Sequence, residues 1–467
     1  MSQTPTERLR DYLSQLPPQS QALLMREFER ALERGDDVAV ASFVLEELRK
    51  IVRGAADDNK PRTEDPARLM FRSFEPFLID ADREPRPGQI RRNSLTSIWQ
   101  WLEREGIPDQ IREFQGGLIA LRGGSTSQVE QLVRKLQAAA AEAIEKVVNP
   151  PPGVDRQRSM SRVGPPSAVE DLVPLGAALK NRDALDGFNG KLSSNLRTFG
   201  DSQVNSMLAA LNVPALQTPI MLPFALSLIL QHLSQPWQIV RLALKVAGSD
   251  DEIRVAATPF AVAVTMALHD LAQLTSELRE EIRRGHYGSV AEKLKQIHDG
   301  VRGLRTELDL RSDSTWGKQL ASIRVEISNA VKSEIESVPG RVRRLLRQRP
   351  DKDIAPGAKL DQLEIDEAAA LIDFVAVCRT YASELAINEV TLRTYSELQQ
   401  YVEKSTEALV QSLRGSDPKV KPFRHMQAEA AVRFCEVLFG EDYASLMHRA
   451  IESAMVVVER KPARAGG

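Results

Sequence analysis

The segment SQVNSMLAALNVPALQTPIMLPFALSLILQHLSQPWQIV, from Ser202 to Val240, contains no Asp, Glu, Lys or Arg. Charged residues make up 27% of the whole chain, so the interval between Asp201 and Arg241 departs strongly from the surrounding composition. Charged side chains rarely enter a dry interior without a partner. The segment is therefore predicted to form the buried centre of the fold, covered by the other elements.

The same segment also has to be tested as a membrane span. Its most apolar part, Pro219 to Leu233, includes Pro223, Gln231 and His232, whereas a span needs about 20 predominantly apolar residues. A second apolar run, Val255 to Leu268, is shorter still. A pair of buried helices is the favoured interpretation, and an integral membrane protein is disfavoured.

The overall composition is that of an ordinary globular protein. The chain has 467 residues and a net charge of -2, which gives no general reason to expect nucleic acid as a partner. Aromatic residues make up only 5% of the chain, and this favours helix over strand. Cys378 and Cys435 are the two cysteines, too few for a disulfide framework. No signal-peptide pattern is found at the N-terminus, so a cytoplasmic location is expected.

Two consecutive segments carry the clearest helical periodicity. Apolar residues recur in each at steps of three and four, and a polar turn from Arg311 to Thr315 separates the segments. The pattern predicts an antiparallel helical hairpin with an apolar seam along each helix. The seams either pack within the domain or pair with a second copy of the chain as a coiled coil. They consist of Val290, Leu294, Ile297, Val301, Leu304 and Leu308, followed by Leu320, Ile323, Ile327, Val331, Ile335 and Val338.

Similar patterns predict helices along most of the chain, and no segment is a convincing strand. Ser94, for example, is expected to cap a helix that carries Ile98 and Trp101. The predicted fold class is all-α, a multi-helix bundle with two main regions joined by a proline-rich linker. The expected regions are an N-terminal helical domain (1–148), a Pro/Ser/Arg-rich linker (149–167), a central helical core (168–349) with the hairpin at 290–338, a linker (350–357), a C-terminal helical region (358–460) and a disordered tail (461–467).

One set of residues could bind a divalent metal. His232, the adjacent His269 and Asp270, and Asp309 follow one another in an order that resembles the ligands of HD-type phosphohydrolases, which are all-helical metal enzymes. In such a site the four side chains would converge on one ion that activates water. The alternative is that both histidines are partly buried members of helical apolar faces. The alternative is favoured, so no metal, cofactor or catalytic residue is predicted.

The strongest polar signal is an arginine-rich segment after the hairpin. Its apolar residues would lie toward one side of a helix, and the arginines would cover the rest. Such a segment could contact the phosphates of an anionic membrane or of nucleic acid. The alternative is a solvated helix whose arginines pair with nearby acids. The candidate anion-binding residues are Arg341, Arg343, Arg344, Arg347 and Arg349.

The sequence carries no catalytic motif, and its many amphipathic helices favour a non-enzymatic interaction or scaffold protein. Its partner would be an unidentified protein or a second copy of the chain, with the hairpin at 290–338 as the candidate surface. One alternative is a metal-dependent all-α hydrolase with its site at the central histidines. The other is a peripheral binder of anionic membrane or of nucleic acid through the basic segment at 341–349. Nucleic acid is the less expected partner, and the absence of interleaved aromatic residues argues against stacking of a single strand.

Overall fold

The computed structural model describes residues 65–80, 83–121, 125–152, 155–192, 196, 198–285, 287–355, 357–385 and 387–455, with a few isolated positions between 13 and 48. The secondary-structure elements of these residues are almost all helices, which confirms the predicted all-α multi-helix fold. The predicted tail at 461–467 lies outside the described residues. The chain divides into two compact units, one formed by Met1–Leu69 with Gln115–Gly124 and the other by Met70–Phe114 with Ser125–Gly467.

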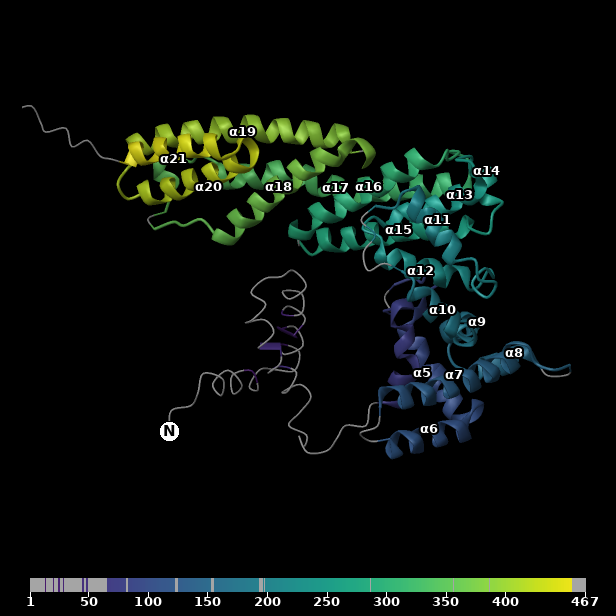
Figure 1. Cartoon of the computed structure of the whole chain (residues 1–467). Coiled ribbons are helices and arrows are strands. Elements are labelled where there is room, and N and C mark those ends of the chain that lie inside the picture. Colours follow the sequence, from purple (N-terminus) through teal and green to yellow (C-terminus); the bar gives the residue numbers. More distant parts are fainter. Residues whose placement is uncertain are drawn as a thin grey trace, which may run out of the picture. The chain divides into compact units, whose positions relative to one another are not determined.

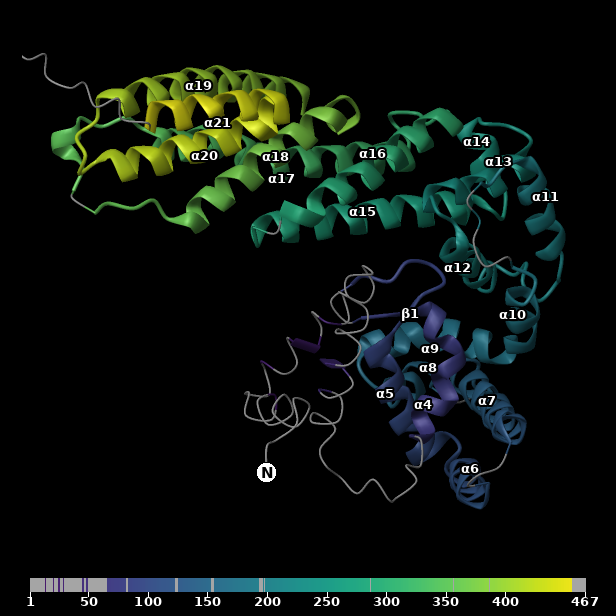
Figure 2. The same cartoon turned by 60° about the vertical axis from the view of Figure 1, so that its left-hand side comes forward.

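In the first unit, Leu13, Val44 and Leu48 form a buried apolar cluster, against which Leu24 and Phe28 pack. The second unit contains the candidate sites described below. Its helices can be followed in Figures 1 and 2. None of the helices described is both long and apolar enough to cross a membrane.

The first part of the second unit is built around the packing of α7 and α5 on α9. The contact between α7 and α9 spans the linker predicted at 149–167, and this linker itself contains the short helix α8. The elements here are η1 (Arg72–Phe77), β1 (Leu78–Ile79), β2 (Ile90–Arg91), α5 (Arg92–Trp101), η2 (Leu102–Gly106), α7 (Thr126–Val148), α8 (Arg156–Ser161), α9 (Pro166–Lys180) and α10 (Arg182–Asn189). The boundary between the two units falls within α4 (Pro66–Phe71) and within α6 (Pro108–Ala120).

Two local predictions fail in this part. β1 and β2 pair in parallel, although no strand was expected. Ser94 does not cap α5, because Arg91 occupies the N-cap position and Ser94 lies inside the helix. Asp171 of α9 explains the shift: it accepts a hydrogen bond from Ser94 Oγ at 2.7 Å and another from the Arg91 backbone N–H at 3.0 Å. A buried carboxylate from a distant helix thus stabilises the start of α5 in place of a local cap.

The uncharged segment is only partly buried. Every residue from Met221 to Leu230 is buried, and these residues form most of α12. The portion from Ser202 to Ile220, in contrast, exposes many Ser, Asn, Gln, Thr and Pro residues, so the prediction that the whole segment is hidden is wrong. These residues are well solvated without carrying charge, and the absence of charge therefore does not require burial.

The central part of the unit combines short helices around α12 with three long helices. Phe224 of α12 packs edge-on against Phe77 at a centroid distance of 5.1 Å, and α12 also contacts η1, η3 and α15. The elements are α11 (Asp201–Ala210), α12 (Leu222–His232), η3 (Pro236–Ile239), α13 (Val240–Ala247), α14 (Glu252–Ala256), α15 (Ala261–Arg283), η4 (Tyr287–Ser289), α16 (Val290–Glu307) and α17 (Thr315–Leu346).

The predicted hairpin, α16 followed by α17, is part of a four-helix arrangement. Both helices pack mainly against α15 and α18 (Gln362–Leu385), and much less against each other. Every residue of the two predicted seams is buried within the chain. The seams therefore fill a shared core. The seams are thus covered within the chain, which is the first of the two alternatives, and self-association of the chain stays a prediction.

The last part of the unit packs directly on α17. This helix continues through Pro339 and Gly340, and it contacts α18, α19 (Asn388–Gly415) and α20 (Lys421–Phe439). These contacts extend across the linker predicted at 350–357, which contains η5 (Asp351–Asp353). In both views α19, α20 and α21 (Glu441–Met455) lie side by side (Figures 1 and 2).

Candidate functional site

A pocket with a volume of about 620 Å³ lies where η3, α15, α16 and α18 meet. Leu271 and Leu274 of α15 contribute apolar surface to its wall. We call it the Trp237 pocket. Its aromatic and charged lining residues are Trp237, Asp270, Glu292, Lys295, Asp299 and Tyr381. A mixture of apolar walls with a few polar groups is typical of a binding site.

Two glycines of α16 allow neighbouring elements to approach closely. A Cβ atom on Gly303 would lie 2.5 Å from the Trp237 ring, and one on Gly300 would lie 2.5 Å from Leu271 Cδ2. The Arg241 guanidinium lies 5.6 Å from the centre of the Trp237 ring, within the range of a cation–π contact. These contacts position Trp237 and one side of the pocket wall on a rigid helical frame.

Asp270 connects the pocket to a buried arginine. Arg86 Nε lies 2.9 Å from Asp270 Oδ1, and Arg86 Nη1 donates a hydrogen bond of 3.0 Å to Ser227 Oγ. Ser227 Oγ in turn donates to the Pro223 carbonyl oxygen at 2.9 Å. Gly88 completes the packing with a φ of +80°, and a Cβ atom there would lie only 2.3 Å from the same carbonyl oxygen. The position requires glycine for both reasons.

The Arg86–Asp270 pair does not fully offset the cost of removing its charges from water. Burial raises the pKa of Asp270, although the Arg86 charge opposes this shift. Burial also lowers the pKa of Arg86, against the opposing effect of Asp270. Both shifts favour the neutral form, as expected when desolvation outweighs the mutual attraction of a buried pair. The Asp270 carboxylate is therefore incompletely compensated on the pocket wall.

The remaining charged groups of the pocket come from α16. Glu292 accepts a hydrogen bond from Gln296 Nε2 at 3.2 Å. Asp299 is half-buried, and no ion pair joins it to any side chain that the structure describes. Lys295 is exposed and likewise has no ionic partner within the described residues. The pocket thus has two carboxylates, Asp270 and Asp299, whose charge is incompletely neutralised.

The four predicted metal candidates do not form a metal centre. Asp270 pairs with Arg86, and the exposed Asp309 donates its backbone N–H to the Asp250 carbonyl at 2.9 Å. His232 is half-buried at the end of α12, and burial lowers the pKa of His269. Among the residues that the structure describes, no three His, Cys, Asp or Glu side chains are grouped so that they could hold a metal ion.

The basic segment forms the end of α17 and the residues that follow it. Three of its five candidate arginines pair with glutamates of α18 and α19, namely Arg341 with Glu367, Arg343 with Glu397 and Arg344 with Glu364. Arg347 and Arg349 are exposed, and neither makes an ion pair with a described residue. Most of the segment's charge is therefore already matched within the chain.

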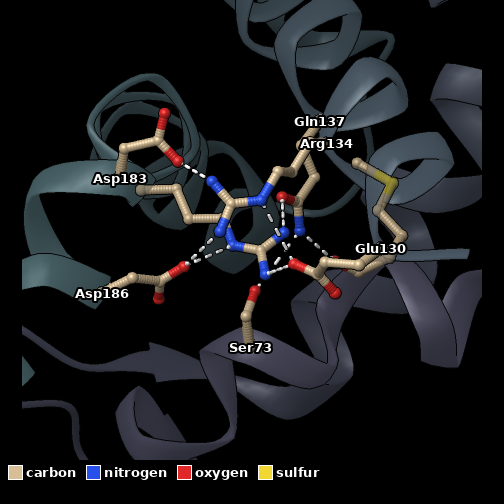
Figure 3. A network of polar contacts seen from close by, with 8 residues as sticks. Ser73, Glu130, Arg134, Gln137, Asp183 and Asp186 are labelled. Carbon is tan, nitrogen blue, oxygen red and sulfur yellow. Dashed lines mark hydrogen bonds and ion pairs between the residues drawn. The ribbon is translucent and has the colours of Figure 1, made fainter. Parts of the chain in front are cut away.

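A second polar network, between α7 and α10, was missed from the sequence (Figure 3). Arg134 contacts Asp183 and also lies 3.2 Å from Asp186 Oδ2 and 3.4 Å from Glu130 Oε1. Arg182 contacts Glu130 and places its Nε 3.2 Å from Asp186 Oδ2. Two arginines thus share three carboxylates. The spacing Arg182-x-x-x-Asp186 could have indicated the local pair, but nothing in the sequence connects it to α7.

Gln137 extends this network into the protein. It accepts from Arg182 and donates through Nε2 to the Met70 carbonyl oxygen at 2.6 Å and to Ser73 Oγ at 3.3 Å. A pocket of about 480 Å³ adjoins the network and is lined by Arg134, Gln137 and Arg182. Since the two arginines are satisfied by their own carboxylates, the network connects α7 and α10 rather than offering free charge to a ligand.

The two cysteine thiols are poor nucleophiles. Burial raises the pKa of Cys378, and it raises the pKa of Cys435 to about 11. Cys435 Sγ also lies 3.3 Å from Thr406 Oγ1. Because the thiolate is the reactive form, both side chains act as apolar packing groups of the C-terminal helices.

Comparison of the chain with protein-family models, with curated proteins and with solved structures finds no match. Its function has to be inferred from the geometry and chemistry of its own residues. Among the sites described above, the Trp237 pocket combines the largest volume with charged groups that the chain itself leaves incompletely matched.

Proposed function

We propose that this chain is a non-enzymatic helical interaction protein that holds a side chain of a partner segment in the Trp237 pocket. The observation that carries the proposal is the pocket itself, about 620 Å³ in volume and lined by residues from three helices and the η3 turn. This volume is within the range of small-ligand sites, and it is ample for one or two side chains of a docked peptide.

The pocket's chemistry supports binding rather than reaction. Its polar wall carries carboxylates and one lysine, and its apolar wall carries leucines and aromatic rings. The buried thiol of Cys435 lies on α20, and that of Cys378 lies on α18; neither lines the pocket, and both are held in their protonated form. Groups of this kind provide an anchor point on a preformed surface, which is how helical interaction proteins hold a partner at low entropic cost.

The rigidity of the pocket walls also supports the proposal. Gly300 and Gly303 hold α16 in close contact with Leu271 and Trp237, and the seam residues of α16 are buried against α15 and α18. A preformed site does not have to be ordered when the partner binds, so more of the contact energy appears as affinity. Because the seams are buried, the proposed interaction surface on the hairpin is the part of α16 that lines the pocket, including Ala291, Lys295 and Asp299.

The test is to fill the pocket by a substitution and to measure which selected peptides no longer bind. Ala291, a half-buried lining residue of α16, is changed to Trp. Ala321→Trp on the exposed side of α17 is the matched control, because it adds the same bulk away from the pocket. A random peptide display library is selected on the wild-type chain and then tested on both variants.

We expect enriched peptides that bind the wild-type chain and Ala321→Trp but bind Ala291→Trp at least about tenfold more weakly. Circular dichroism and thermal melting establish that both variants are folded. The proposal is abandoned if no peptide family is enriched, or if every enriched family binds Ala291→Trp as well as it binds the wild-type chain.

A further inference from the structure

The charge of the Trp237 pocket favours one class of anchoring side chain. Three carboxylates, Asp270, Glu292 and Asp299, line it together with a single lysine, Lys295. Lys295 and Glu292 are exposed, so water and salt screen both of them strongly. The half-buried groups Asp270 and Asp299 are less screened, and both are acidic.

Of these two acids, Asp270 is the one that is paired with a buried cation. Its side chain is 29% exposed, and its partner Arg86 is 9% exposed. Arg86 also donates to Ser227, so one guanidinium serves two acceptors. The raised pKa of Asp270 shows that this guanidinium does not make up for the water lost on burial. A second cation entering from the pocket side would supply the missing stabilisation.

The Asp299 carboxylate has no cationic partner among the described residues that would compete with a ligand for it. It lies on α16, and no described residue forms an ion pair with it. The adjacent His298 ring contacts that of Tyr381 in a tilted arrangement, with a ring-centroid distance of 5.2 Å, and so packs against the wall residue supplied by α18. An incoming donor could therefore bond Asp299 without breaking an existing ion pair, which makes such a contact favourable on binding.

The rest of the pocket wall suits an apolar stem. Leu271 and Leu274 of α15 and the ring of Tyr381 provide apolar surface, along which the methylene groups of a long basic side chain can pack. We infer that the Trp237 pocket selects a lysine or arginine side chain of the partner segment, with its cationic end at Asp270 and Asp299. This inference rests on the proposed function, because it names the chemistry of the partner at the same site.

The same cation on an apolar stem could also be a free polyamine. The test therefore compares three probes: acetyl-Leu-Arg-Leu-amide, its neutral isostere acetyl-Leu-citrulline-Leu-amide, and spermidine. Binding to the full-length chain labelled with 5-fluorotryptophan is followed by fluorine NMR. The Trp237 signal is assigned from a Trp237→Phe variant.

We expect the arginine peptide to bind about tenfold more tightly than the citrulline peptide. Asp299→Asn should remove most of this preference, whereas Asp373→Asn on the exposed face of α18 should leave it unchanged. Lys295→Gln should strengthen binding of the arginine peptide a few-fold, because it removes the one cationic lining residue of the pocket, which repels the ligand. An effect of opposite sign at Lys295 distinguishes an electrostatic role from general damage to the fold.

The binding of the three probes and of the display peptides tests both proposals. If both peptides bind equally well and Ala291→Trp abolishes both, the cation inference is wrong and the interaction function stands. If spermidine binds in an Asp299-dependent way while neither these peptides nor any display peptide binds, the pocket selects a free cation, and both the interaction function and the inferred partner side chain are wrong. If no probe and no display peptide binds, both are wrong.

Discussion

Two arginine–carboxylate clusters in this chain solve the same electrostatic problem in opposite ways. Between α7 and α10, Arg134 and Arg182 share three carboxylates, and Arg134 and its acidic partners keep substantial contact with water. At the Trp237 pocket, the nearly inaccessible Arg86 pairs with a single carboxylate, that of Asp270. The first cluster satisfies its own charges, whereas the second leaves both charges poorly compensated. The comparison indicates that a charged ligand would be stabilised at the Trp237 pocket and not at the cluster between α7 and α10.

The largest expected effect comes from breaking the buried pair. Arg86→Met leaves the Asp270 carboxylate partly buried without a cationic partner. Removing one partner of such a pair costs about 3 kcal/mol of folding free energy. The double variant Arg86→Met with Asp270→Leu should recover most of that loss, because it removes both desolvation costs. Urea unfolding followed by circular dichroism measures the free energy of unfolding of the single and the double variant. Equal losses in the single and double variants would show that the pair is not the cause.

A smaller effect is expected from Gly303→Ala. The added Cβ would meet the Trp237 ring at 2.5 Å, so either the indole or α16 must move, at a cost of about 2 kcal/mol. Gly340→Ala on α17 is the control, since nothing lies within 4 Å of a Cβ built there. Thermal unfolding and the fluorine signal of Trp237 report the change. An unchanged signal would mean that the ring is not held by α16.

The pH dependence of stability is expected to be smaller but characteristic. Because the pKa of Asp270 is raised in the folded chain, its contribution is most favourable when it is protonated. That contribution is lost as the pH rises from the ordinary value for Asp, about 3.9, through the raised folded value. Over this window the wild-type chain should lose stability relative to the Arg86→Met, Asp270→Leu double variant. If the free energies of unfolding of the two proteins changed with pH in parallel over this window, the raised pKa of Asp270 would be contradicted.

The smallest effect is expected in the exposed cluster. Asp183→Asn removes one of three acids that share Arg134 and Arg182, and exposed ion pairs of this kind contribute about 0.5 kcal/mol or less. The loss should shrink further in 1 M salt because the charges are screened. A loss as large as that of Arg86→Met, measured under the same conditions, would remove the distinction between the two clusters.

The parts of the fold that were predictable depend on local periodicity. The spacing of apolar residues alone predicts which side chains are buried in the two seams, Val290 to Leu308 and Leu320 to Val338. The spacing could not say what covers them, because no local pattern identifies α15 and α18, which flank the hairpin in sequence, as the helices that pack against both seams. The absence of charge from Ser202 to Ile220 misled for a different reason, since neutral polar residues are also well solvated.

The candidate site was less predictable than the fold. Asp270 was singled out from the sequence, but its partner Arg86 comes from the loop between β1 and β2, which no sequence pattern connects to α15. Trp237, Asp299 and Tyr381 lie on three separate elements that only tertiary packing brings together. Similarly, the glutamates that pair with the arginines of α17 belong to α18 and α19.

A crystal structure of the chain with a display-selected peptide bound would test the central claim most directly. The account predicts a lysine or arginine side chain of the peptide in the Trp237 pocket, with its nitrogen atoms within about 3 Å of the Asp270 or Asp299 carboxylate oxygens. A peptide seated on any other surface, or one that fills the pocket with a neutral or acidic side chain, would contradict it.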